Sequence, residues 1–166
     1  IKKGELGKVN SILAEMSIWH TPAYRKWLGN FQGGDMYIFG SHLIDLIVYL
    51  LGRPNRVMSS LRASGKDGVD SIDLSAAILE YDHALAQVFS SSVQVDGHEQ
   101  RRFTVDGSLG TVHICPIEGP FQMTFAPHHD GKTTLHHAQP EELRPAEGWH
   151  RHDDMMIPSH DYVLGN

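Results

Sequence analysis

One glycine-led segment constrains this chain more than any other feature. It begins at Gly33-Gly34-Asp35, continues as an apolar run, and stops at Leu51-Gly52-Arg53-Pro54. An aspartate can cap the free N–H groups of a helix, and glycine followed by proline ends one. The pattern therefore predicts a helix over residues 35–51 with Asp35 as its cap. His42 and Asp45 lie three residues apart and share one face of this helix.

Short strands joined by tight turns make up most of the remaining pattern. Residues 71–81 alternate, with Ile72, Leu74, Ala76 and Ile78 on one face. Successive strands at short spacing indicate an antiparallel sheet, and one clear helix beside it makes the class α+β. Strands are predicted at residues 7–20, 57–63, 71–81, 84–95, 99–105, 111–115 and 121–125. Residues 23–31 are interpreted as a loop or one helical turn, and residues 127–160 as loops with one strand at 132–137.

Composition bounds the class of protein. A chain of 166 residues with 40% hydrophobic and 20% charged residues is typical of one soluble globular domain. The net charge of -6 disfavours nucleic acid as a partner. The longest apolar stretch, residues 43–51, is too short to span a membrane, and no apolar core of a signal peptide follows the first residues. Cys115 is the only cysteine, so no internal disulfide can form and a cytoplasmic location fits best. Because the sequence starts at Ile1 rather than Met, we expect a fragment.

An ordered set of motifs resembles the C-terminal domain of the Gfo/Idh/MocA family of sugar and cyclitol dehydrogenases. The set covers roughly residues 4–116, and it is more specific than any of its pieces. It comprises Gly4-Glu5-Leu6-Gly7-Lys8 at the domain entry, Gln32-Gly33-Gly34, His42-Leu43-Ile44-Asp45, Leu51-Gly52-Arg53-Pro54 and a late hairpin at Asp106-Gly107-Ser108-Leu109-Gly110.

The resemblance implies an open, mostly antiparallel sheet with helices on one face. It further implies that residues 1–166 form a single substrate-binding and dimerisation domain, and that the bare sheet face makes a homodimer or a higher homo-oligomer. NAD or NADP would be bound mainly by an N-terminal Rossmann domain that this sequence lacks, because no G-x-G-x-x-G is present. The expected function is hydride transfer from a CH–OH group of a small sugar or cyclitol, with the fragment inactive alone.

His42 is the catalytic candidate. Oxidation of an alcohol needs a base for the hydroxyl proton, and an imidazole with a pKa near ~6.5 suits that task. A histidine packed in a helix and hydrogen bonded to the backbone is the alternative interpretation. The family often places an aspartate four residues before this histidine, where Ile38 stands here. Asp35 and Asp45 could lie on the same helix face as His42. Asp45 is a candidate for substrate binding or, alternatively, for a polar contact that anchors the helix to the sheet.

Further substrate-binding candidates precede the helix. The family uses this loop to line its cleft, where aromatic faces stack on sugar rings and cations bind hydroxyls or acids. An ordinary amphipathic loop is the alternative, and for Tyr37 the alternative is a buried core tyrosine. The candidates in this loop are Trp19, His20, Arg25, Lys26 and Trp27, with Tyr24 in the same cluster, and Tyr37 inside the predicted helix is a further candidate.

Two other functions stay open. A non-catalytic carbohydrate-binding or scaffold module would explain Ile38 and the absent cofactor half. A metal-dependent enzyme could use the late histidines, of which His150, His152 and Asp153 make the best trio by proximity. Their spacing matches no standard zinc pattern, so no metal site is predicted and surface histidines are the preferred interpretation.

Overall fold

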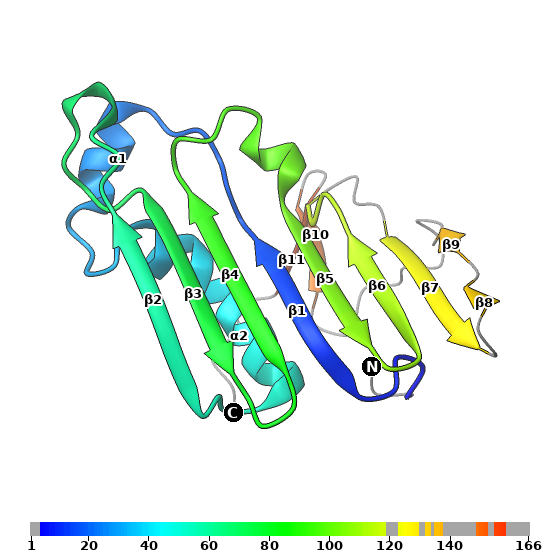
Figure 1. Cartoon of the computed structure of the whole chain (residues 1–166). Helices are drawn as coiled ribbons and strands as arrows, with labels where there is room; N and C mark the ends of the chain where they lie inside the picture. Colours follow the sequence, from blue (N-terminus) through cyan, green and yellow to red (C-terminus); the bar gives the residue numbers. More distant parts are fainter. Residues whose placement is uncertain are drawn as a thin grey trace.

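A nine-stranded sheet dominates the computed structural model, which describes residues 4–118, 123–129, 132–133, 135–137, 149–152 and 155–158. Its order is β2-β3-β4-β1-β5-β6-β7-β8, with β9 also paired to β7. The pairs are antiparallel except for β1 and β4, which run parallel (Figure 1). The strands are β1 (Val9–Glu15), β2 (Arg56–Arg62), β3 (Leu74–Glu80), β4 (Leu85–Ser91), β5 (Arg102–Gly107), β6 (Gly110–Ile114), β7 (Met123–His129), β8 (Lys132–Thr133) and β9 (His136–His137).

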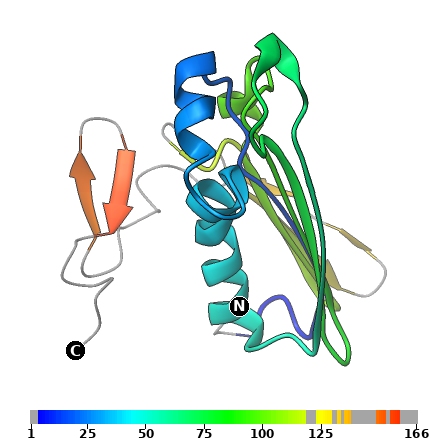
Figure 2. The same ribbon diagram turned by 90° about the vertical axis from the view of Figure 1, so that its left-hand side faces the viewer.

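The predicted class and sheet are confirmed. The open sheet carries its helices on one face, which Figure 2 shows from the side. A separate hairpin of β10 (Trp149–His152) and β11 (Met155–Pro158) lies where loops were expected. Among the described residues, no helix is long and apolar enough to cross a membrane.

The central helix begins differently from the prediction. Met36–Gly40 forms a π-helical turn, and α2 (Ser41–Leu51) continues from it to Gly52. Asp35 makes no capping hydrogen bond with its side chain, which is buried against β3 instead. Single π turns are often found at functional sites, because they rotate the side chains that follow.

A second helix, of seven residues, takes the place of the loop or single helical turn predicted at residues 23–31. Helix α1 spans Pro22–Leu28, and Thr21 caps it by accepting a hydrogen bond from the Tyr24 backbone N–H at 3.3 Å. A threonine followed by proline is compatible with a turn, but threonine at the cap and proline at the first helical position also begin a helix.

The hydrophobic core lies between α2 and the inner face of the sheet. Leu43 and Ile47 of α2 are 2% and 0% exposed, and both pack onto the central strands. The sheet contributes Ile12, Ala14, Ala77, Leu79, Ala86, Val88, Phe103 and Val105. In β3 this inner face continues as Ser75 and, just before the strand, Asp73, while Leu74, Ala76 and Ile78 lie on the outer face.

Candidate functional site

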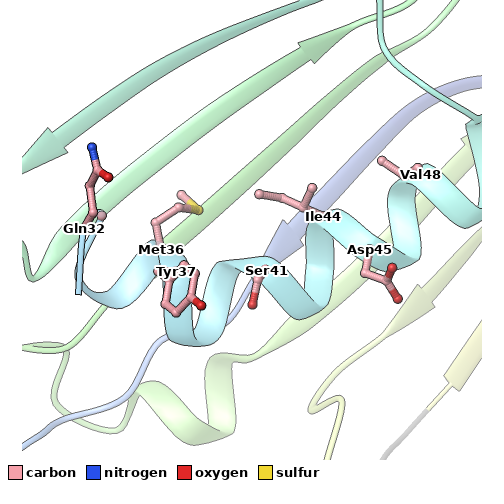
Figure 3. A pocket seen from close by; sticks show the side chains of 8 residues that line it. Gln32, Met36, Tyr37, Ser41, Ile44, Asp45 and Val48 are labelled. Atoms are coloured by element: carbon pink, nitrogen blue, oxygen red, sulfur yellow. The ribbon is translucent and has the colours of Figure 1, made fainter. Parts of the chain in front are cut away.

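An open groove lies beside the start of α2. Its volume is about 610 Å³, and it runs along the helix flank shown in Figure 3. Two predicted substrate-binding residues, Tyr37 and Asp45, line it. The full lining is Gln32, Gly33, Met36, Tyr37, Ser41, Ile44, Asp45 and Val48.

The lining combines an apolar floor with a few polar groups, which is typical of small-molecule sites. Tyr37 is 59% exposed, so it is not the buried core tyrosine that was the alternative. Gln32 and Ser41 add an amide and a hydroxyl that the sequence analysis did not assign to binding. Ser41 could have been found from spacing, because positions 37, 41, 45 and 48 fall on one helical stripe.

His42 is exposed on α2 but does not line the groove. Within the described residues no hydrogen bond joins it to Asp45, although the two lie three positions apart on the helix. Asp35 lies on the buried side of the same segment, against β3, and therefore does not share the exposed stripe of His42. The carboxylate nearest to His42 along the exposed helix face is thus that of Asp45.

A row of aromatic rings connects α1 to the groove. The ring centroids of His20 and Tyr24 are 4.1 Å apart, and those of Tyr24 and Trp27 are 5.1 Å apart. The row continues from Trp27 to Phe31 at 4.7 Å and from Phe31 to Tyr37 at 5.8 Å. Aromatic pairs at these separations stabilise one another, so the row makes a preformed surface from α1 to the groove.

His20 ends this row in a half-buried position. Its ring also stacks on Phe39 of the π-helical turn, with centroids 5.2 Å apart. Its Nε2 atom is buried without a hydrogen-bond partner among the described residues. Burial, and then the nearby Arg101 guanidinium, lower the pKa of His20, which keeps its ring neutral around pH 7.

The remaining candidates separate into exposed and buried groups. Trp19 and Trp27 are each 46% exposed, and Lys26 is exposed, so all three can meet a ligand. Arg25 differs from the expectation, because its side chain is 0% exposed. Its Nη1 donates to Asp73 Oδ2 and to the Lys66 carbonyl at 3.1 Å each.

Arg25 therefore acts as an internal tie, meaning a buried side chain whose hydrogen bonds and ion pairs join α1 to residues 66–73. Its Nη2 pairs with Asp67, whose backbone has φ 56°, and the Ser71 hydroxyl donates to the Arg25 carbonyl at 2.7 Å. A buried guanidinium needs such partners, because an uncompensated charge away from water is costly. The tie joins α1 to residues 66–73, and we leave Arg25 out of the candidate site.

Among the described residues, no late histidine lines this groove. His150 and His152 lie on β10, but their side chains fall outside the described part of the structure, as does Asp153. Among the described residues, no group of three or more His, Cys, Asp or Glu is placed to hold a metal ion.

Comparison with known proteins identifies the family. Residues 1–113 match the GFO/IDH/MocA C-terminal domain. The chain belongs to this family. No curated protein matches the chain at a significant level.

Several solved structures share the GFO/IDH/MocA C-terminal fold of this chain. A candidate oxidoreductase from Yersinia pestis has a TM-score of 0.71 at 19% identity, over 99% of this chain and 47% of its own. A candidate NADPH-dependent oxidoreductase from Desulfitobacterium hafniense has a TM-score of 0.71 at 18% identity, over 84% and 44%. The WlbA dehydrogenase from Bordetella pertussis, solved with NADH and UDP-GlcNAcA, has a TM-score of 0.60 at 20% identity, over 69% and 36%. The chain thus spans less than half the length of these three proteins.

Proposed function

We propose that this chain is the substrate-binding and dimerisation domain of an NAD(P)-dependent oxidoreductase. The proposed reaction oxidises a CH–OH group of a sugar or cyclitol by hydride transfer. The observation that carries the proposal is the groove beside α2, which is lined by Tyr37 of the π-helical turn and by Ser41 and Asp45 of the helix that also bears His42. Family membership supports it, as does the fold shared with a dehydrogenase solved with NADH and UDP-GlcNAcA.

The groove offers the chemistry that a polyol requires. The exposed face of Tyr37 can pack against the C–H side of a sugar ring, and the carboxylate of Asp45 can accept hydrogen bonds from two hydroxyls. The Ser41 hydroxyl and the Gln32 amide can each donate and accept. In the middle of the aromatic row, Trp27 and the neighbouring Lys26 would contact a substrate that extends from the groove toward α1. Trp19 and His20 stay in the proposed set.

His42 is the proposed general base. Its exposed imidazole would take the hydroxyl proton as the carbon loses its hydride, which leaves a carbonyl in the product and an imidazolium on the protein. The nicotinamide cofactor, when bound, supplies the hydride acceptor. We assign no described residue to the cofactor, because the chain lacks the glycine-rich strand-to-helix turn that holds a dinucleotide pyrophosphate. This chain by itself should therefore not turn over.

The test is His42→Ala in the longer protein that joins this domain to a nucleotide-binding half. Loss of the base should lower kcat by about 10²–10⁴ with little change in KM, measured as reduction of the nicotinamide at 340 nm on a panel of sugars and cyclitols, about neutral pH. His83→Ala is the matched control, since His83 is exposed at the β3–β4 turn beside the far end of α2. Full activity in His42→Ala would refute its role.

A non-catalytic carbohydrate-binding module is the second candidate. It is favoured by Ile38 at the family's acidic position and by the absence of a hydrogen bond between His42 and Asp45 among the described residues. This alternative predicts that a sugar binds, with heat released in calorimetry, while no sugar is oxidised even with the nucleotide-binding half present. Turnover of any bound sugar would exclude it.

A further inference from the structure

A carboxylate is enclosed beneath the π-helical turn. Asp35 is 0% exposed and immediately precedes Met36–Gly40. Its Oδ1 accepts a hydrogen bond from the Ser75 hydroxyl on β3, whereas its Oδ2 has no partner among the described residues. An ionised carboxylate with an unpaired buried oxygen is costly, because water no longer solvates the charge.

The groups around Asp35 do little to stabilise its charge. Ser90 on β4 faces it, but its hydroxyl donates to the Met16 carbonyl at 3.0 Å, and one hydroxyl has only one proton to give. The charged group that acts on Asp35 is Asp73, next to β3, whose own charge is paired with Arg25 of α1. The inward side chains of α2, Leu43 and Ile47, are apolar. Burial, with Asp73 adding to it, raises the pKa of Asp35 to about 6 despite the Ser75 hydrogen bond.

The backbone around Asp35 is pressed against the chain that enters β3. Gly34 has φ +53°, and a Cβ atom there would lie 2.2 Å from the Ile72 carbonyl oxygen. The Asp35 N–H donates to the same oxygen at 3.3 Å. The turn docked in this way carries Met36 and Tyr37, which line the groove. Asp35 thus lies on the buried side of the element whose other side forms the candidate site.

We propose that Asp35 is a positioning residue that couples proton binding to the placement of the groove-lining turn. With a proton on its carboxyl group, Asp35 stays docked against Ser75 and holds residues 33–40 on the sheet. When it ionises, the unpaired charge favours states in which these residues separate from β3 and let water reach the carboxylate. The proposed function gives this coupling its purpose, but the docking and its test do not depend on any substrate.

The experiment uses NMR on the whole 166-residue chain. The side-chain carboxyl carbon of Asp35 should titrate with a midpoint near pH 6, well above an ordinary aspartate at about 3.9. Amide hydrogen exchange at residues 34–40, corrected for the intrinsic rate, should accelerate by up to about tenfold per pH unit between the ordinary aspartate pKa of about 3.9 and the Asp35 midpoint, and should level off above that midpoint. Amides of Leu43 and Ile47 should show no such dependence. In Asp35→Asn, exchange at residues 34–40 should not depend on pH.

Two further variants keep the proposal falsifiable. Asp70→Asn removes an exposed carboxylate and should retain the wild-type pH dependence. Ser75→Ala removes the hydrogen-bond donor to Asp35 and should raise the titration midpoint further, which tests the coupling even if Asp35→Asn does not fold. An Asp35 midpoint at the ordinary value, or unchanged pH dependence in Asp35→Asn, would overturn the proposal. These measurements use no ligand, so a failure of the chain's parent to oxidise sugars would not change the conclusion about Asp35. A negative result for Asp35 would likewise leave the proposed sugar oxidation untouched.

Discussion

At the scale of single residues, the polar groups buried between helices and sheet distinguish this domain. Arg25, Asp35 and Asp73 are each 0% exposed, yet they lie far apart in the sequence. Arg25 and Asp73 compensate one another, whereas Asp35 accepts a hydrogen bond from the Ser75 hydroxyl and has no paired cation among the described residues. The first pair should stabilise the fold strongly, and the lone carboxylate should weaken it when ionised.

Arg25→Ala should lower the free energy of unfolding by about 3–5 kcal/mol, because it leaves the Asp73 carboxylate buried without its cation. Urea unfolding followed by tryptophan fluorescence measures this. Lys26→Ala is the matched control, since Lys26 is the exposed neighbour on α1 and should change stability by less than about 0.5 kcal/mol. Equal effects of the two substitutions would contradict the role of Arg25 as an internal tie.

Asp35→Asn should stabilise the protein above pH 6 and not below pH 4. The folded-state pKa of Asp35 is raised from 3.8 to about 6, so the wild-type fold binds the proton more tightly than the unfolded chain does. The wild type therefore loses stability as pH rises through this window, to a total of about 1–3 kcal/mol. Urea unfolding of both proteins at pH 4 and pH 7.5 compares them. A difference that is the same at both pH values would argue against ionisation as its cause.

At the scale of elements, α2 is the one long helix among the described residues, and it joins core to groove. Its inner side chains Leu43 and Ile47 cover β1, β3, β4 and β5, while Ser41 and Asp45 face the groove. The π-helical turn before it places Tyr37 beside those groups. Packing of Leu43 and Ile47 on the sheet therefore sets the position of Ser41 and Asp45 in the groove.

Ile47→Ala should destabilise the domain by about 2–5 kcal/mol, because Ile47 is 0% exposed and its removal leaves a cavity at the centre of the core. Chemical denaturation measures the loss. Leu46→Ala on the same helix is the control, since Leu46 is 40% exposed and its truncation removes less buried area than truncation of Ile47. If both variants were equally stable, α2 would not be held by its inner stripe.

At the scale of the whole molecule, the sheet has one covered face and one bare face (Figure 2). A row of outer side chains crosses the strands from Leu13 on β1 through Gln87 and Ile78 to Met58 on β2. Leu13 is 50% exposed and Met58 39% exposed. Exposed rows in which apolar side chains predominate, as three of these four do, are typical of protein interfaces, which supports the proposed homodimer.

The double variant Leu13→Glu, Met58→Glu should convert a dimer to a monomer, because two charges would be buried in the interface. Sedimentation velocity at several protein concentrations measures the change. Leu46→Glu, on the helical face, is the control and should leave the sedimentation coefficient unchanged. A wild-type chain that sediments as a monomer at all concentrations would contradict the proposed assembly for this domain.

Structural features that are set by residues close together in the chain could be predicted from the sequence alone. The helix that ends at Leu51, the strand succession and the α+β class were predictable, because periodicity, capping residues and turn residues act over a few positions. The ordered motifs also indicated the family. The start of α1 was missed, since Thr21-Pro22 favours either a turn or a helix start until the residues that follow are packed.

Only the tertiary structure decided which polar residues became internal. Arg25 meets Asp67 and Asp73 across 42 and 48 positions of sequence, and Asp35 meets Ser75 across 40. In β3, both faces carry apolar residues, so alternation could not reveal that the face with Asp73 and Ser75 lies inward. The groove likewise requires the loop at Gln32 to lie beside α2. Local patterns set the form of each element, but long-range pairing of charges and hydrogen bonds determines which of its faces is buried, because burial of a polar group depends on a partner from elsewhere in the chain.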